Sequence, residues 1–431
     1  MAIATPVEAP PADDAPAPPR RWVLIAAAYF VLRVMFLLAS HAFETPDTES
    51  YRAGQGTRPP LSSALLSWLG DTPYVIVSVL VSTAGFLALA VSMWDDERRR
   101  WSSGVIGAVG LMSFIPAITV YEHWLVPDSL LVGLSLMALA LAWRREATRW
   151  QSWSLVGLCV LITLTKEVGV AVVVLVVAVV AIRRSWRPAL ATALLCGLLA
   201  VTLVLPASSR QGTVLWHEPR DTELTMERFR VIVSALMWSD LSPELQNVND
   251  LAADCGMTFN QLVAETFLLT EDIVAFKNCP DLWAAVDDLS QADILLMHVR
   301  DPKYVDDSIE RGFAPSLYAM TLWGGYQWGP QLWLSIDRWL AGLMALLPIA
   351  AVAISLARAQ GRRLALVALA GTGLALAAAL IDPTGQERHA LVFRVVAAII
   401  ALMSLTEATE PSERSASPDD VAPPVAVGNE G

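Results

Sequence analysis

Apolar runs long enough to cross a lipid bilayer recur along most of this 431-residue chain. A helix of about 20 apolar residues spans the hydrocarbon core and satisfies its own backbone hydrogen bonds there. The mean hydropathy of +0.49 and the 55% share of hydrophobic residues exceed what a water-soluble core needs. We therefore expect an all-α polytopic membrane protein with about ten transmembrane helices. The expected spans are residues 22–40, 73–94, 105–120, 126–143, 154–165, 168–182, 188–206, 332–357, 364–381 and 390–405.

The polar segments between these spans define the expected organisation of the chain. Residues 1–19 and 406–431 are rich in proline and acidic residues and are expected to be disordered tails. Residues 20–206 carry the first seven spans and include a charged loop at 41–72. A long polar region at 207–331, expected to be mostly helical, separates them from the last three spans at 332–405.

The distribution of cations gives these spans an orientation. Cytoplasmic loops of membrane proteins carry an excess of Lys and Arg. If the N-terminus is cytoplasmic, the short outside loops hold only Arg52, Arg58, Lys166 and Arg388. We therefore expect a multi-pass protein of a bacterial inner membrane, with both termini in the cytoplasm and residues 207–331 outside. The cations collected inside are Arg20, Arg21, Arg98, Arg99, Arg100, Arg144, Arg145, Arg149, Arg183, Arg184, Arg187, Arg358, Arg362, Arg363 and Arg414.

Net charge and cysteine positions narrow the partners and the compartment. The formal charge of −12 argues against nucleic acid as a partner. Cys159 and Cys196 fall within apolar spans and are expected to be buried. Cys255 and Cys279 fall in the outside region, where an oxidising compartment would allow them to form a disulfide.

The loop after the first span is unusually charged for its place at a membrane surface. It holds the carboxylates Glu44, Asp47 and Glu49, and two consecutive prolines after Arg58 stiffen its return to the membrane. A rigid acidic loop is a good platform for a general base. We expect Asp47 and Glu49 to be catalytic, and Tyr51 and Arg58 to bind substrate. A solvated loop without chemistry is the alternative.

Three further loops bring ionisable groups to the same face of the membrane, where such groups are costly and usually functional. We expect them to bind substrate, with the cations among them holding a phosphate. A helix cap at Asp128, a simple turn at Lys166 and interfacial anchoring by Arg388 are the structural alternatives. The groups are Glu122 and His123 after the third span, Lys166 and Glu167 after the fifth, and Arg388 and His389 before the tenth.

One arginine lies inside the first span rather than at its end. Arg33 is near the middle of the span, where its side chain cannot easily reach water. We therefore expect Arg33 to face inward and to bind a partner on another helix.

The sequence offers little support for a metal or a nucleotide. None of the five histidines shows metal-ligand spacing, so we expect no metal site and no cofactor, although the need for a divalent cation stays open. No P-loop, GxGxxG, GxSxG or CxxC motif is present, which argues against nucleotide-driven and hydrolase chemistry.

Taken in order, these motifs resemble those of the GT-C superfamily of polytopic glycosyltransferases, especially protein O-mannosyltransferases, lipid A aminoarabinose transferases and related bacterial sugar transferases. The resemblance implies inverting transfer of a sugar from a polyprenyl-phosphate donor to an envelope glycan, lipid or protein on the extracytoplasmic side. It also implies that a loop Asp is the general base. The matching stretches are Leu32-Arg33, Asp47-Thr-Glu-Ser-Tyr51, Arg58-Pro-Pro-Leu61, Pro127-Asp128, Leu164-Thr-Lys166-Glu167 and Glu387-Arg388-His389.

Two points stay open at the level of sequence. The relatives often carry adjacent Asp and Glu, whereas Thr48 separates Asp47 from Glu49 here, so either acid is a candidate base. A lipid or solute transporter or flippase, and a non-enzymatic envelope scaffold, are the alternative functions. A transporter should show broken or charged segments at mid-membrane and often an internal repeat, and no repeat is seen in this sequence.

Overall fold

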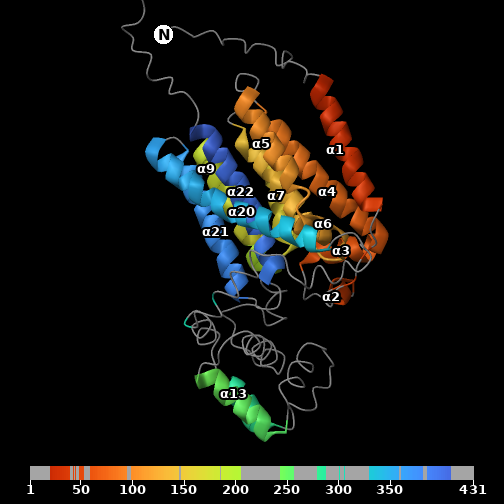
Figure 1. Cartoon of the computed structure of the whole chain (residues 1–431), viewed down its shortest axis with the longest axis vertical. Helices are drawn as coiled ribbons and strands as arrows, with labels where there is room; N and C mark the ends of the chain where they lie inside the picture. The colour runs from red at the N-terminus through yellow and green to blue at the C-terminus, as the bar shows by residue number, and fades with distance from the viewer. Residues whose placement is uncertain are drawn as a thin grey trace, which may run out of the picture.

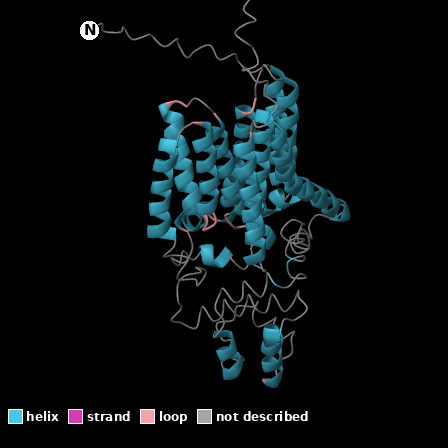
Figure 2. Ribbon diagram, turned by 90° about the vertical axis from the view of Figure 1, so that its left-hand side faces the viewer, coloured by secondary structure: helices cyan, strands magenta, loops and turns pink. Residues whose placement is uncertain are grey.

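The computed structural model describes the membrane-spanning part of the chain almost completely. All regular elements within the described residues are helices, which fill the bundle drawn in Figure 2. Both tails beyond these helices, and most of 207–331, lie outside the described residues. The described residues are 20–38, 42, 44, 48–52, 59–94, 99–144, 147–184, 186–204, 243–256, 279–287, 300, 305, 330–358, 361–381 and 386–408.

Each expected span is helical, which confirms an all-α polytopic membrane protein. Within the described residues, four helices are long and apolar enough to cross a membrane: Asp71–Ser92, Trp186–Leu203, Arg362–Leu380 and His389–Ala408. The helices that match the expected spans are α1 (Arg20–Leu38), α4 (Asp71–Ser92), α5 (Arg99–Met112), α6 (Pro116–His123), α7 (Asp128–Trp143), α8 (Arg149–Thr165), α9 (Gly169–Arg183), α10 (Trp186–Leu199) with the π-helical η1 (Ala200–Val204), α20 (Pro330–Arg358), α21 (Arg362–Ile381) and α22 (Gln386–Ala408).

Helix α7 forms the centre of the bundle. It packs against α4, α8, α9 and α22, and nearly all of its side chains are buried (Figure 1). The contact with α4 is too close for larger residues. A Cβ atom on Gly133 would lie 2.7 Å from the backbone nitrogen of Ser82, and one on Gly85 would lie 2.5 Å from the carbonyl oxygen of Gly133. Glycine at both positions lets the two backbones approach, as small residues do in membrane helix pairs.

The expected third span, 105–120, consists of two helices rather than one. Helix α5 ends at Met112, and α6 begins at Pro116. A proline lacks the backbone N–H that a continuing helix needs and clashes with the preceding turn, so Pro116 starts a new helix. The break leaves the carbonyl oxygen of Ser113 available to a side chain from another helix.

Arg33 uses that carbonyl oxygen and confirms the expected inward partner. Its Nη1 donates to Ser113 O at 2.7 Å, and its Nη2 forms an ion pair with Glu122 of α6. Its Nε donates to Thr83 Oγ1 of α4 at 3.3 Å. Arg33 and Glu122 are only 1% and 2% exposed. Most other described side chains of α1 face outward, so Arg33, together with the ring of Tyr29 against Phe114, ties α1 to the bundle edge seen in Figure 1.

The loop at 41–72, which is expected to lie outside, contains two helices that the sequence did not predict. Helix α2 spans Thr48–Arg52 and α3 spans Pro60–Leu69. Pro60 stands at the start of α3, where its fixed backbone angle favours a helix. The prolines therefore do more than stiffen the loop, because they begin a helix that lies against the bundle.

The polar region at 207–331 contributes two described helices, α13 (Pro243–Asp254) and α16 (Pro280–Asp287). Helix α13 lies beyond the same end of the bundle as α2 (Figure 1). Cys255 and Cys279 follow α13 and precede α16, and they form a disulfide with Cα atoms 5.8 Å apart. Cys159 and Cys196 are free and buried, as expected.

We predict that removing only one member of the Arg33–Glu122 pair destabilises the protein more than removing both. Arg33→Met leaves a buried carboxylate without its cation, which typically costs about 3–5 kcal/mol, whereas replacing both charges by apolar residues can be nearly neutral. The measurement is the free energy of unfolding in mixed micelles for Arg33→Met, Glu122→Met and the double variant. A double variant as unstable as the sum of the two single variants would contradict this coupling.

We also predict that the denatured, unreduced protein takes up two alkyl groups, on Cys159 and Cys196, and four after reduction. Intact-mass spectrometry measures the number directly. Uptake of four groups without a reductant would show that the disulfide is absent.

Candidate functional site

Three of the expected outside loops meet at one end of the bundle. Thr48 of α2 donates from Oγ1 to the carbonyl oxygen of Leu125, in the connection between α6 and α7, at 3.4 Å. Ser62 of α3 donates to the carbonyl oxygen of Thr165, at the end of α8, at 2.5 Å. These bonds join segments 77 and 103 residues apart in sequence. Figure 1 shows α2, α3 and α6 together at this end.

A buried ion pair joins two of these loops. Lys166 follows the last residue of α8, and its Nζ lies 2.5 Å from Oδ1 of Asp128, the first residue of α7. The two side chains are 3% and 5% exposed. The carboxylate of Asp128 also stands in the first turn of α7, where the helix dipole favours negative charge. The sequence suggested each residue separately, but it left Asp128 open between a helix cap and a site residue and did not pair it with Lys166.

Several buried polar atoms on the segments that adjoin this pair in sequence, or bond to them, lack hydrogen-bond partners within the described part of the chain. They are Ser63 Oγ, Trp124 Nε1, Ser129 Oγ and Glu167 Oε1. Ser129 directly follows Asp128, Glu167 directly follows Lys166, and Ser63 directly follows Ser62. More than nine in ten buried polar groups are hydrogen-bonded, so an unsatisfied cluster calls for an explanation. Sequence reasoning found Glu167 but missed the other three, because isolated Ser and Trp residues give no signal.

Glu122 and His123 both lie at the end of α6, but their side chains bind different partners. Glu122 is bound by Arg33 inside the bundle. The ring nitrogen Nδ1 of His123 donates to the carbonyl oxygen of Thr119, at 2.8 Å. Both side chains are buried. Their predicted contact with substrate stays a prediction.

The remaining predicted residues differ in how far the structure describes them. Tyr51 is buried in α2, and His389 is half-buried in the first turn of α22. Asp47 and Arg58 lie outside the described residues. Glu49 belongs to α2 and Arg388 to α22, but their side chains are not among those described. The assignment of Asp47 and Glu49 as catalytic residues therefore stays a prediction.

Arg52, which the sequence left unassigned, holds α2 against the start of α4. Its Nη2 lies 2.7 Å from Oε1 of Glu44 and 2.9 Å from Oδ1 of Asp71. Hydrogen bonds from the guanidinium to Glu44 and then to Asp71 raise the pKa of Arg52 above its usual value. Arg52 and both partner carboxylates are accessible to solvent, so we assign this cluster a positioning role.

The described residues contain no group of three or more His, Cys, Asp or Glu side chains arranged to hold a metal ion. The polar side chains that the structure describes at this end of the bundle instead offer a cation, neutral N–H and O–H donors, and a carboxylate. This combination suits a ligand that carries both negative charge and hydroxyl groups.

Comparisons with known proteins give two structural matches. No protein-family model matches the sequence, and no curated protein matches it. Two crystal structures of ArnT from Cupriavidus metallidurans align with the chain, one in the apo state and one bound to undecaprenyl phosphate. They are 14% identical to it, with TM-scores of 0.33, and the alignments cover 89% and 90% of this chain and 77% and 78% of theirs. Similarity at this level does not assign the chain to a family.

We predict opposite effects on stability for two serines of α7. The Ser129 hydroxyl is buried without a described partner, so Ser129→Ala should leave the free energy of unfolding unchanged or raise it by up to about 1 kcal/mol. Ser135 donates to the carbonyl oxygen of Leu131 at 2.6 Å, so Ser135→Ala should lower it by about 1 kcal/mol. Unfolding without added ligand is the measurement. An equal loss in both variants would show that the Ser129 hydroxyl is already satisfied by the protein.

Proposed function

We propose that this protein is an inverting membrane glycosyltransferase that moves a sugar from a polyprenyl-phosphate donor to an envelope acceptor on the extracytoplasmic side. Asp47 is the general base, and Glu49 orients the acceptor or replaces Asp47 in that role. Lys166 and Arg388 bind the lipid phosphate. The other contacts to substrate come from Tyr51, Arg58, Glu122, His123, Glu167 and His389.

The observation that supports this proposal best is the buried Lys166–Asp128 pair beside unsatisfied polar atoms. A lysine ammonium is a compact point charge with three N–H donors, and Asp128 fixes where that charge lies. The indole N–H of Trp124 and the hydroxyl of Ser129 add neutral donors, which suit phosphate and sugar oxygens. The carboxylate oxygen of Glu167 adds an acceptor for a sugar hydroxyl. A phosphate-linked sugar has the groups that would satisfy this set.

The proposed reaction needs one proton transfer and one displacement. Asp47 removes the proton from the acceptor hydroxyl, and the resulting oxygen nucleophile attacks the anomeric carbon. The bond between that carbon and the phosphate oxygen breaks on the opposite face, which inverts the configuration. The electron pair leaves with the phosphate, and the cations Lys166 and Arg388 stabilise its charge. The products are a glycosylated acceptor and polyprenyl phosphate.

The proposal predicts that Asp47→Asn lowers transfer by about 10²–10⁴-fold, the usual contribution of a general base. The assay mixes purified protein with radiolabelled polyprenyl-phosphate sugars and an envelope extract, and it measures labelled acceptor and released polyprenyl phosphate. Asp250→Asn is the control, because Asp250 is an exposed carboxylate of α13 that takes no part in the proposed site. It should retain activity. Unfolding of each variant is measured in parallel to exclude misfolding.

The outcomes distinguish an error in the assigned general base from an error in the proposed reaction. A large loss in Glu49→Gln with retained activity in Asp47→Asn would move the base to Glu49 and keep the reaction. Substrate-dependent lipid movement in liposomes, without product from any donor tested, would contradict the transferase and favour a transporter.

A further inference from the structure

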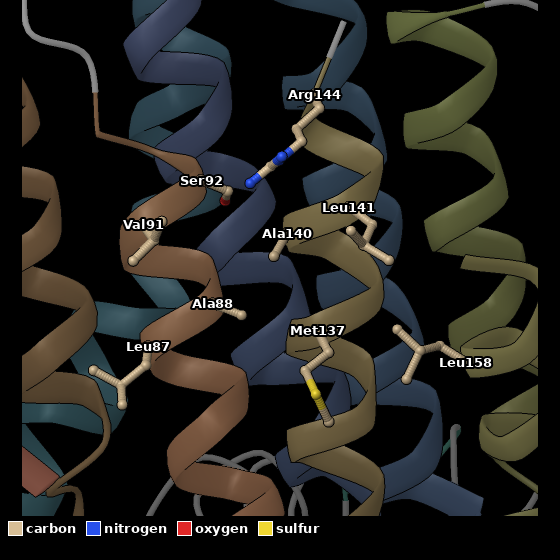
Figure 3. Close-up of a pocket in the computed structure, with 9 residues that line it drawn as sticks. All are labelled: Leu87, Ala88, Val91, Ser92, Met137, Ala140, Leu141, Arg144 and Leu158. Atoms are coloured by element: carbon tan, nitrogen blue, oxygen red, sulfur yellow. The ribbon is translucent and has the colours of Figure 1, made fainter. Parts of the chain in front are cut away.

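An apolar groove lies at the other end of α7 from the candidate site. It has a volume of about 360 Å³ and runs between α4, α7 and α8. Leu87, Met137, Leu141 and Leu158 contribute to its walls from the three helices, and Figure 3 labels each of them. Val91, which also lines it, is 65% exposed, so the groove opens on the outer surface of the bundle. Helix α4 is long and apolar enough to cross a membrane, so we expect that surface to face acyl chains.

A cation covers the upper end of this groove. Arg144 follows the last residue of α7, and its side chain extends across the groove toward Ser92, at the end of α4 (Figure 3). Helix α7 has 16 residues, which at 1.5 Å per residue separates Arg144 from Asp128 by about 24 Å. The groove is therefore distinct from the Lys166–Asp128 site.

A second guanidinium, that of Arg184, lies beside Arg144 and adds a second positive charge. Arg184 donates from Nε to the carbonyl oxygen of Arg144 at 2.8 Å, and from Nη2 to the carbonyl oxygen of Leu141. Burial and the neighbouring charge of Arg144 lower the pKa of Arg184 below its usual value. Within the described part of the chain, no carboxylate forms an ion pair with either group. By contrast, the adjacent Arg183 is neutralised by Glu407.

We propose that this groove binds an anionic glycerophospholipid of the surrounding bilayer, with an acyl chain along its apolar wall and the phosphate on Arg144. The phosphate oxygens accept hydrogen bonds from the Arg144 guanidinium, and the charge of Arg184 strengthens the attraction. The arginine-rich end of the bundle is the end expected to face the cytoplasm, where anionic headgroups attract basic residues. Basic pockets between membrane helices on that side recognise phospholipid headgroups. The site does not depend on the proposed transferase reaction.

The experiment measures lipid binding to the delipidated full chain by native mass spectrometry. Phosphatidylglycerol and phosphatidylcholine with identical acyl chains are the probes. Both lipids carry a phosphate, but the choline cation cancels the charge of phosphatidylcholine and is repelled by the two guanidiniums. Wild type should therefore bind one phosphatidylglycerol about tenfold more tightly than phosphatidylcholine. Arg144→Gln should bring the ratio to about one. Arg362→Gln is the matched control, because Arg362 is an exposed arginine that begins α21 and does not line the groove.

A second variant tests the acyl-chain part of the proposal. Ala88 lines the groove from α4, and Ala88→Leu fills part of its volume without changing charge. This variant should weaken the binding of both lipids, and Arg144→Gln keeps the proposal testable if Ala88→Leu fails to fold. Equal binding of both lipids by wild type, or a preserved preference in Arg144→Gln, would overturn it. A third outcome would also overturn the proposal. If polyprenyl phosphate displaces phosphatidylglycerol from wild type but not from Arg144→Gln, the ligand that Arg144 selects is polyprenyl phosphate and not a glycerophospholipid.

Discussion

One buried guanidinium makes the polar contacts that hold the first helix to the bundle. A charged side chain inside a membrane bundle needs a counter-ion and hydrogen-bond acceptors, because lipid supplies neither. Arg33 finds them in Glu122 of α6, in the carbonyl oxygen exposed at the α5–α6 break, and in hydroxyls of α4. The outward side chains of α1 gain little from packing against the bundle. The polar contacts of Arg33 therefore fix the helix from which the acidic loop begins.

The central helix α7 separates two kinds of charge. Its first residue, Asp128, neutralises Lys166 at the end where α2, α3 and α6 gather. At its other end, guanidiniums approach the carbonyl groups that a helix leaves unsatisfied: Arg183 donates to Trp143 O and Arg184 to Arg144 O. The ends of one helix thus favour a negative side chain at the start and cations at the finish. This polarity suits phosphate chemistry near Lys166 and anionic lipid near Arg144.

Single residues show how far sequence reasoning reached and where it stopped. The mid-span position of Arg33 was enough to predict an inward partner, because the membrane leaves a buried cation few alternatives. The partner itself, Glu122, was predicted to bind substrate. Its ion pair with Arg33 could not be predicted, because no pattern in the sequence links positions 89 residues apart. The position of Asp128 in the sequence is also typical of a helix cap. Only the tertiary structure shows that Lys166, which follows α8, forms an ion pair with it. The serines and tryptophan around that pair carry no sequence signal at all.

The sequence by itself determined the all-α class, the approximate place of each span and the gathering of arginines at one end of the bundle. These follow from transfer of apolar residues into lipid and from backbone hydrogen bonding within a helix, which are local properties of the chain. Only the tertiary structure decided which charges neutralise one another and which buried polar atoms stay unsatisfied. Those depend on contacts between distant segments, where a shift of a few ångströms makes or breaks a hydrogen bond.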